Sequence, residues 1–241
     1  MHISTIRIEN LYLAFKKQVI FSQASLALQV GKSYCLIGKN GTGKSSLLYL
    51  LLGFLKPQQG HIYYDTQPLV RLSAAAKQQI GYMGDVSGLI EELNAMQYLR
   101  LMGAIYHLPP KQAEARSQEL LQYFFEDTED LKHKHIKTYS SGMKKKLEII
   151  AAVLHQPNIL FLDEPFAALD LPFSERLITF LEEYSSPERI ILFSSHNAEY
   201  IRRIEAEVLL ISEQKIQTVE RSTLLEDSDS GSHQQLLKLL Q

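Results

Sequence analysis

The most informative stretch in this chain of 241 residues is Gly38-Lys39-Asn40-Gly41-Thr42-Gly43-Lys44-Ser45. It fits the pattern GxxxxGK[ST], which forms a phosphate-binding loop when a buried strand precedes it and a helix follows it. The apolar residues 33–37 predict such a strand, and residues 45–54 predict a helix that ends near Pro57. Glycines let the backbone turn its N–H groups toward a phosphate chain, and the start of the helix adds its positive dipole end. The stretch therefore predicts an α/β fold with a nucleotide site at the end of a buried strand.

The side chains of this stretch predict contacts to ATP and Mg²⁺. Lys44 supplies a positive charge for the β- and γ-phosphates, which makes it a candidate catalytic residue, and the Ser45 hydroxyl is a suitable Mg²⁺ ligand. The nucleotide contacts expected here are Gly38, Asn40, Gly41, Thr42, Gly43, Lys44, Ser45 and Ser46.

An acid pair follows the apolar residues 159–162. A strand buried on both faces needs such an apolar run, and ligands of parallel sheets bind at the carboxyl ends of strands, where Asp163 and Glu164 fall. Asp163 is then placed to hold Mg²⁺, and Glu164 is placed to polarise an attacking water as general base. A strand followed by a solvated acidic turn is the alternative interpretation.

The rest of the chain alternates between strand and helix patterns. Ile6 and Ile8, and later Leu26 and Leu28, alternate with polar residues, which predicts β-hairpins near the N-terminus. The later patterns predict helices within 91–125 and at 141–154 and 173–184, and strands at 60–64, 79–83, 158–162 and 189–194. Such alternation implies parallel pairing with helices covering the sheet.

Composition limits the classes of function. The formal net charge of -2 offers no long-range attraction to nucleic acid, so we expect no nucleic-acid partner. The longest apolar stretch, residues 47–55, is far shorter than the roughly 20 residues of a membrane span, and the N-terminal residues lack the pattern of a signal peptide. The single cysteine, Cys35, lies in an apolar run and is interpreted as a buried core thiol. We therefore expect a soluble chain in a reducing compartment.

Three further stretches resemble the ATP-binding cassette (ABC) ATPases. Tyr139-Ser140-Ser141-Gly142-Met143, followed by Lys144-Lys145-Lys146-Leu147, resembles the signature of this family, LSGGQ in its common form. Pro165-Phe166-Ala167-Ala168-Leu169-Asp170 resembles its D-loop, and Ser194-Ser195-His196 resembles the strand end that carries its switch histidine. With the phosphate-binding loop and the acid pair, these elements match the family in order from about residue 3 to residue 220.

The resemblance implies a detailed fold. The expected class is α/β, a P-loop NTPase with a mainly parallel sheet core, an N-terminal antiparallel β subdomain and an inserted helical subdomain. One ABC nucleotide-binding domain would cover residues 1–220, with the helical signature subdomain at about 86–156. Residues 221–241 would form a short C-terminal tail.

The resemblance also implies how the site is completed. In this family two cassettes pack head to tail and enclose two ATP molecules, so Ser140, Ser141 and Gly142 would contact the γ-phosphate held by the partner's loop. His196 would hydrogen-bond the γ-phosphate and orient the water together with Glu164.

Two more nucleotide contacts follow from the resemblance. Phe15 would stack on adenine, and Asp170 would contribute from the D-loop. Phe15 as an ordinary core residue, and Tyr12 as the stacking residue, are the alternatives.

The sequence departs from the family pattern at several positions. Asp85 stands where the family has a glutamine that touches Mg²⁺ and the attacking water; Asp is shorter and charged, and it remains a candidate metal ligand and nucleotide contact. Ser141 and Met143 replace a glycine and the glutamine of the signature. The run Lys144-Lys145-Lys146 is interpreted as a solvated helix face.

These observations predict an ATP-hydrolysing subunit of an ABC transporter, most similar to the exporter-type cassettes of bacterial ABC-2 systems. Its partners would be a second cassette, as a homodimer or a paired homologue, and separate membrane-spanning permease subunits that dock on residues 84–106. It would be cytoplasmic and peripheral on the cytoplasmic face of the membrane. The alternative is a soluble ABC-type ATPase of iron–sulfur cluster assembly or another non-transport process. The chain has no NKxD motif, which argues against a GTPase, and nothing in it indicates the transported molecule.

Overall fold

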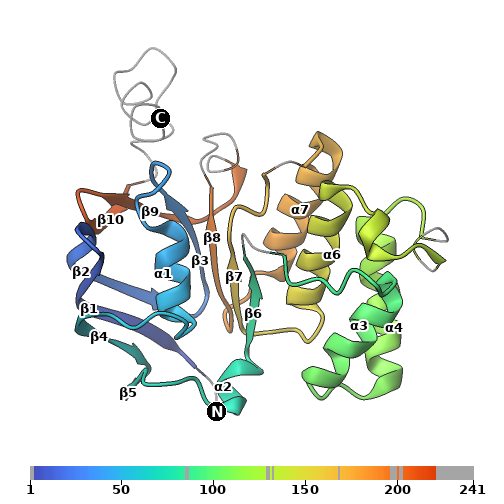
Figure 1. The fold of residues 1–241 in the computed structure, drawn as a ribbon, viewed down its shortest axis with the longest axis horizontal. Helices are drawn as coiled ribbons and strands as arrows, with labels where there is room; N and C mark the ends of the chain where they lie inside the picture. Colours follow the sequence, from blue (N-terminus) through green and yellow to red (C-terminus); the bar gives the residue numbers. More distant parts are fainter. Residues whose placement is uncertain are drawn as a thin grey trace.

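The computed structural model describes residues 3–84, 87–128, 131, 133–167, 169–195, 200 and 203–220. Two β-sheets lie side by side, and a group of helices lies beyond the edge of the larger sheet (Figure 1). Asp85, His196 and the expected tail at 221–241 lie outside the described residues.

The larger sheet has six strands in the order β10-β9-β3-β8-β7-β6. They are β3 (Lys32–Ile37), β6 (Ile80–Met83), β7 (Ile159–Leu162), β8 (Ile190–Ser194), β9 (Glu207–Ser212) and β10 (Lys215–Val219). β10 pairs antiparallel with β9, whereas the other neighbours pair in parallel. β7 and β8 are buried at every residue, which explains their apolar sequences. The predicted mainly parallel core is confirmed.

The register of this sheet brings three strand ends to one edge. Leu36 of β3 lies opposite Ser194 of β8, and Leu162 of β7 lies opposite Phe193 of β8. Because these strands are parallel, the segments that follow β3, β7 and β8 leave the sheet at the same edge. This is the edge at which open α/β sheets bind their ligands.

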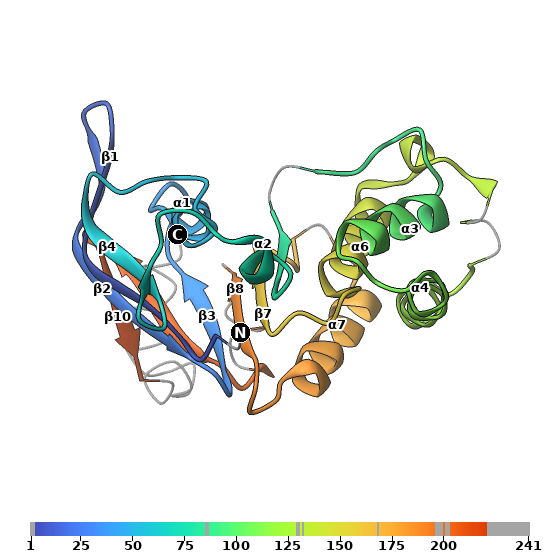
Figure 2. The same ribbon diagram turned by 90° about the horizontal axis from the view of Figure 1, so that it is seen from below.

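The smaller sheet is antiparallel and has the order β2-β1-β4-β5. Its strands are β1 (Thr5–Phe15), β2 (Gln18–Gln29), β4 (Gln59–Tyr64) and β5 (Gln67–Pro68). Helix α1 (Lys44–Leu51) lies between the two sheets (Figures 1 and 2). Its four leucines, Leu47, Leu48, Leu50 and Leu51, are fully buried, because a helix covered on two sides needs apolar residues around most of its surface. The predicted N-terminal antiparallel subdomain is confirmed.

The inserted helices lie beside β6 and β7 (Figure 2). Their buried side chains form one hydrophobic core with strand residues such as Leu160 and Leu162. In the described part of the chain, the helical elements beyond α1 are α2 (Ala74–Lys77), α3 (Ala95–Ile105), α4 (Pro110–Phe124), η1 (Ile136–Thr138), α6 (Ser141–Val153) and α7 (Leu171–Tyr184). Asn94 and Gln97 cap the start of α3 reciprocally, and Pro110 is the first residue of α4. The helical pattern predicted for residues 91–125 is therefore two helices, divided before Pro110.

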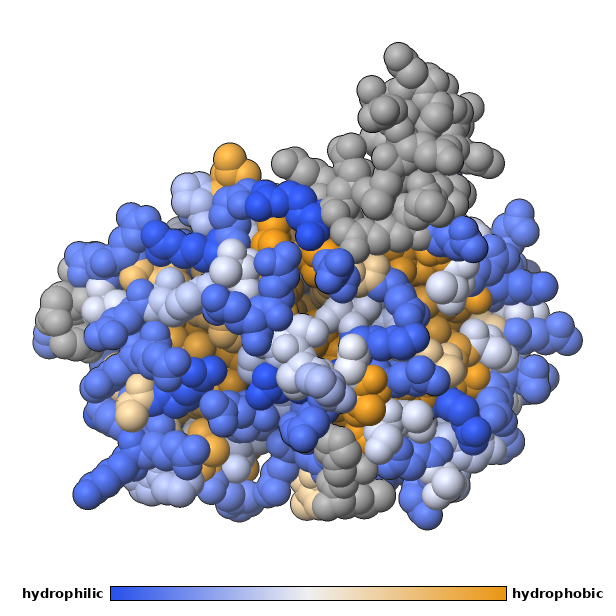
Figure 3. Space-filling model, turned by 180° about the vertical axis from the view of Figure 1, so that it is seen from behind, coloured by the Kyte–Doolittle hydropathy of each residue, from blue (hydrophilic) through white to orange (hydrophobic). Residues whose placement is uncertain are grey.

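Within the described ranges, no helix has the length and apolar character needed to cross a membrane. The face opposite to that of Figure 1 is mostly hydrophilic, and its apolar residues form separate patches (Figure 3). Cys35 is buried in the core as predicted, and burial raises the pKa of its thiol.

Candidate nucleotide site at the ends of β3 and β7

The phosphate-binding loop joins β3 to α1, as its sequence predicts. Residues 38–43 leave the sheet at Ile37, and the helix begins at Lys44. Gly43 has a φ of 111°, and a Cβ there would lie 2.4 Å from Ile20 Cγ2, so the position requires glycine. The Thr42 hydroxyl donates to the Lys39 carbonyl over 2.9 Å and closes the loop.

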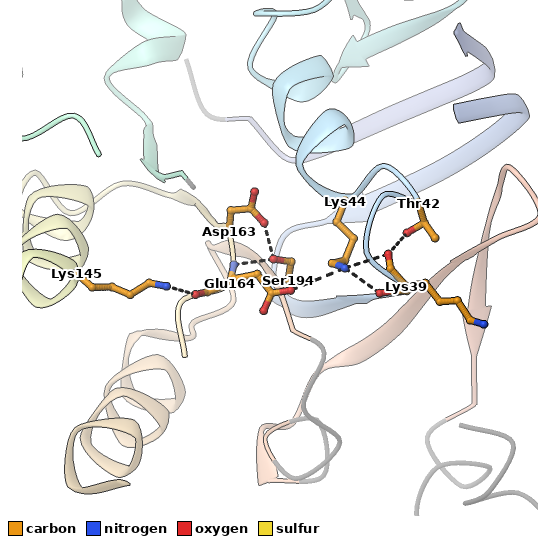
Figure 4. Close-up of polar contacts among 8 residues, drawn as sticks. Lys39, Thr42, Lys44, Lys145, Asp163, Glu164 and Ser194 are labelled. Atoms are coloured by element: carbon orange, nitrogen blue, oxygen red, sulfur yellow. Dashed lines mark hydrogen bonds and ion pairs between the residues drawn. The ribbon is translucent and has the colours of Figure 1, made fainter. Parts of the chain in front are cut away.

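Lys44 is the charged centre of this loop. Its side chain is buried, and its Nζ donates to the Gly38 carbonyl at 2.8 Å and the Lys39 carbonyl at 3.4 Å. The same Nζ lies 3.8 Å from Glu164 Oε1 (Figure 4). A buried ammonium needs such partners. Lys44 and Glu164 are 120 residues apart in the sequence. The phosphate-binding loop and the acid pair therefore meet in the folded chain.

Asp163 lies almost completely buried at the end of β7, with 2% of its surface exposed. Its Oδ1 accepts a hydrogen bond from Ser194 Oγ at 2.6 Å. Its Oδ2 is buried and has no hydrogen-bond partner among the residues that the structure describes. Burying a carboxylate oxygen without a partner is unfavourable, and carboxylate oxygens are preferred Mg²⁺ ligands. The chemistry of Asp163 therefore fits a ligand of a divalent cation. Ser45, another metal ligand expected from the sequence, lies in the first turn of α1.

Ser194 is a part of the site that sequence reasoning missed. Its hydroxyl donates to Asp163 and accepts from the Glu164 N–H at 2.7 Å (Figure 4). One hydroxyl thus orients both acids. The signal in the sequence was the polar residue that ends the buried strand β8, next to the strand that carries the acids.

Glu164 has an unusual backbone. Its φ is 47°, in the left-handed region, which costs a residue with a side chain about 1–2 kcal/mol. About a quarter of its side chain is exposed (25%). The turn directs the carboxylate of Glu164 toward the phosphate-binding loop rather than along the strand (Figure 4).

The signature stretch lies elsewhere in the molecule. Ser140 caps the start of α6, where its Oγ accepts from the Met143 N–H at 3.2 Å. Ser140 and Ser141 are exposed, and Gly142 is partly exposed. Helix α6 lies on the opposite side of β6 and β7 from α1 (Figures 1 and 2). Within one chain, the signature stretch therefore does not lie beside the phosphate-binding loop.

The interpretation of the three lysines after the signature as a solvated helix face is wrong. Lys144 pairs with Glu91, and Lys145 donates to backbone carbonyls at the end of β7. Lys146 Nζ lies 3.8 Å from Asp170 and 4.6 Å from the centre of the Phe173 ring. All three are only partly exposed. The helix face is packed because the segment after β7 lies against it.

Phe15 and Asp170 are two further residues that we expect to contact the nucleotide. Phe15 is 45% exposed at the end of β1, so the core alternative for this ring is wrong. Asp170 caps the start of α7, where its Oδ1 accepts from the Phe173 N–H at 2.8 Å. Asp85 and His196 are the two predicted site residues that lie outside the described residues.

Known proteins with similar sequences are named as ATP-binding proteins. The family model for ABC transporters matches residues 21–167. The ABC transporter ATP-binding protein NatA of Bacillus subtilis (strain 168) is 31% identical over 199 residues, which cover 81% of this chain and 80% of that protein. The linearmycin resistance ATP-binding protein LnrL of the same strain is 31% identical over 193 residues, which cover 80% of this chain and 61% of that protein.

Solved structures show the same fold. The structure of an ATP-binding subunit of an ABC transporter aligns with a TM-score of 0.84 at 24% identity, covering 97% of this chain and 99% of that chain. A dimeric ATP-binding cassette bound to ADP and Pi aligns with a TM-score of 0.78 at 19% identity, covering 89% of this chain and 98% of that chain.

The phosphate-binding loop, the acids after β7 and the inserted helices define a P-loop ATPase with the ATP-binding cassette fold. The chain belongs to the ABC transporter family, and within it to the subunits that bind and hydrolyse ATP. The resemblance seen in the signature and its neighbours is confirmed.

Proposed function

We propose that this chain works as one half of a head-to-tail pair of cassettes, which uses ATP to move a substrate through separate membrane-spanning subunits. The observation that carries the proposal is the meeting of Lys44, Asp163 and Glu164 at one edge of the sheet, while the signature helix presents its exposed start elsewhere. The pair would be a homodimer or a pairing with a homologue, peripheral on the cytoplasmic face of the membrane.

The residues of the loop and those that follow β7 would have different roles within one site. The loop amides and Lys44 would bind the phosphates, with Asn40, Gly41, Thr42 and Ser46 completing the loop's contacts. Ser45 and Asp163, with Asp85, would hold Mg²⁺, which supplies positive charge against the phosphate oxygens.

Glu164 is the group best placed to act as general base. Its carboxylate lies beside Lys44, so a water between Glu164 and the γ-phosphate would give up its proton to this carboxylate as it attacks. His196 would orient the same water. Phe15, exposed at the end of β1, would stack on the adenine, because stacking needs only an open aromatic face.

The signature helix would serve the nucleotide of the second cassette. Ser140 and Ser141 are exposed at the start of α6, a helix of 13 residues, and the N-terminus of a helix attracts anions. With Gly142 they would contact the γ-phosphate across the interface, and Asp170 would lie in the same interface. One chain alone therefore supplies only part of each site.

The membrane-spanning subunits would dock between the core and the inserted helices. A cavity of about 150 Å³ lies there, lined in part by Tyr82, Met102 and Tyr106. Ile90 and Ile105, which fall in the range 84–106 that we expect to form the docking groove, are exposed. Relatives are named for resistance or export, such as the daunorubicin resistance ATP-binding protein DrrA3 of Streptomyces coeruleorubidus, 38% identical over 140 residues that cover 44% of that protein. These names support an exporter-type system.

The domain limits remain a proposal. We place the nucleotide-binding domain at residues 1–220, with the helical signature subdomain at about 86–156, and treat residues 221–241 as a separate tail. The described helices α3, α4 and α6 fall inside the proposed subdomain limits.

The test of this function is Glu164→Gln. It keeps the size of the side chain but removes the base, so ATP turnover should fall by at least about 100-fold while ATP affinity stays within a few fold. With ATP and Mg²⁺, the variant should elute as a stable dimer in size-exclusion chromatography, because the ATP that joins the two cassettes is no longer hydrolysed. Turnover at the wild-type rate would reject Glu164 as the base.

A matched control uses the same chemical change at a distance. Glu188 is exposed in the loop that leads into β8, at the opposite edge of the sheet. Glu188→Gln should hydrolyse ATP at the wild-type rate and stay monomeric or dimeric as the wild type does. A loss of turnover in this control would mean that removing surface charge is enough to inactivate the protein.

A further inference from the structure

We propose that Lys145 is a positioning residue for hydrolysis, which holds the Glu164 peptide in the orientation that presents its carboxylate to the phosphate-binding loop. The inference rests on the proposed role of Glu164 as the base. Lys145 Nζ donates to the Glu164 carbonyl at 2.5 Å and to the Ala167 carbonyl at 3.2 Å. Lys145 and Lys44 reach Glu164 from opposite sides (Figure 4).

The Glu164 peptide groups need such a support. The left-handed φ of 47° is unfavourable for a residue with a side chain, and the following Pro165 disfavours the right-handed helical alternative. The Glu164 N–H is held by Ser194 Oγ at 2.7 Å, and its carbonyl also accepts from the Ala167 N–H at 3.2 Å. The charged donor of Lys145 adds the stronger bond on the carbonyl side, because charge-assisted hydrogen bonds exceed neutral ones.

The surroundings of Lys145 suit this task. Its side chain is partly buried, and burial lowers the pKa of Lys145, while the nearby carboxylates of Glu164, Glu148 and Asp163 act in the opposite direction. Two carbonyl groups take the place of water around the ammonium. A side chain without a donor at this position would remove the charged hydrogen bond from both carbonyls and leave the Glu164 carbonyl with the Ala167 N–H alone.

The contact also connects two parts of the proposed dimer. Lys145 lies on α6, the helix whose exposed start at Ser140 is proposed to meet the second cassette's nucleotide. The next residue, Lys146, lies 3.8 Å from Asp170 at the far end of the segment that follows β7. Consecutive lysines of one helix thus hold both ends of the segment 164–170. A shift of α6 would therefore reach the base of the same chain.

Lys145→Met tests the proposal, because it keeps the apolar stem and removes the donor. We expect kcat to fall roughly 10- to 100-fold, the size of effect that follows from misplacing a catalytic group by about 1 Å. KM and the affinity for a fluorescent ATP analogue should stay within about twofold, since no phosphate contact is lost. Lys145→Arg, which can still donate to both carbonyls, should recover kcat to within about fivefold of the wild type.

The matched control is the neighbouring lysine. Lys144→Met removes the same charge from the same helix, but the ion pair of Lys144 is with Glu91 and not with the segment after β7. Its kcat should stay within about twofold of the wild type. A wild-type kcat in Lys145→Met, or an equal loss in Lys145→Met and Lys144→Met, would overturn the proposal.

A second measurement separates positioning from general damage. Single-turnover rates are compared for Lys145→Met, Glu164→Gln and the double variant. If Lys145 acts through Glu164, adding Lys145→Met to Glu164→Gln should slow the residual rate by less than about twofold. A further loss of about 10-fold or more would show that Lys145 acts by another route. If melting shows that Lys145→Met is unfolded, Lys145→Leu, which also lacks a donor, replaces it, and the same split between kcat and KM is required.

The outcomes also distinguish this proposal from the function on which it rests. If Glu164→Gln hydrolyses ATP at the wild-type rate, both the base and its positioning residue are rejected. If Glu164→Gln is inactive while Lys145→Met keeps full kcat, only the role of Lys145 is rejected.

Discussion

Gly43 occupies the backbone position of the phosphate-binding loop that a side chain would disturb most. Its φ of 111° is left-handed, and an added Cβ would lie 2.4 Å from Ile20 Cγ2. Gly41 is also left-handed, with a φ of 81°, but a Cβ added there meets nothing within 4 Å. The two glycines therefore separate the effect of backbone strain from the effect of packing against β2.

Gly43→Ala should destabilise the protein more than Gly41→Ala does. We expect the free energy of unfolding to fall by about 2–4 kcal/mol for Gly43→Ala, where strain and overlap add, and by about 1 kcal/mol for Gly41→Ala, where only strain applies. Urea denaturation without nucleotide measures both values. Equal losses in the two variants would contradict the importance of the contact with Ile20.

Among the elements, α3 is joined to the segment after α6 by two stacked rings. The rings of Tyr106 and His155 are 3.5 Å apart at their centres and almost parallel, with 4° between their planes. His155 Nε2 lies 3.2 Å from the Ile80 carbonyl, to which its neutral form donates, at the start of β6. Burial lowers the pKa of His155 to about 4. The stack therefore connects the inserted helices to the core through a histidine that stays neutral.

This histidine should make stability depend on pH. The unfolded chain takes up a proton near the ordinary pKa of about 6.5, whereas the folded protein resists protonation until about pH 4. The contribution to stability is therefore complete above pH 6.5 and is lost as the pH falls toward 4. From these two pKa values the loss between pH 7 and pH 5 amounts to about 2 kcal/mol.

His155→Phe should remove this dependence, because it keeps an aromatic ring against Tyr106 but cannot take up a proton. Urea denaturation of both proteins at pH 7 and pH 5 gives the measurement. Lowering the pH from 7 to 5 should reduce the free energy of unfolding of the wild type by about 2 kcal/mol more than that of the variant. Parallel pH dependence in the two proteins would contradict the neutral state assigned to His155.

The strands β9 and β10 show why part of the fold could not be predicted. Their hairpin turns at Glu213 and Gln214, which have positive φ values of 48° and 64°. Such a turn is normally marked by Gly, Asn or Asp, and neither residue gives that signal. The strands β3 and β7 were predictable because their apolar runs and the glycines or acids that follow are local features.

The same distinction applies to the site. Lys44, Asp163 and Glu164 were predicted because neighbouring residues define their positions. Ser194 and Lys145 were not, since their contacts to Asp163 and Glu164 cross 31 and 19 residues of sequence and depend on the packing of β8 and α6. A lysine on a helix face has the same local pattern whether it is solvated or bonded to a distant carbonyl.

For the molecule as a whole, the separation of the signature from the phosphate-binding loop determines how variants should combine. A head-to-tail homodimer contains two sites, each built from one chain's loop and the other chain's signature. Lys44→Ala damages the loop, and Gly142→Asp places a negative charge at the start of α6. Each variant alone should be nearly inactive, because both of its sites carry one damaged part.

Mixing the two variants should restore activity. In the mixed dimer one site joins an intact Lys44 to an intact Gly142, and the other site carries both defects. With random pairing, half of the dimers are mixed and have one working site of two, so the mixture should reach roughly a quarter of the wild-type ATPase rate. A mixture as inactive as its components would contradict sites shared between chains.

The two sheets that enclose α1 leave this helix little surface that faces water. Amide hydrogens around its buried leucines can therefore exchange with deuterium only when a sheet separates from the helix, a rare event compared with fraying of an exposed element. The loop that follows β3 is fixed at one end to this slowly exchanging segment, while residues 39–41 face solvent. ATP should accordingly protect those tip amides and leave the deuterium uptake of the helix itself almost unchanged.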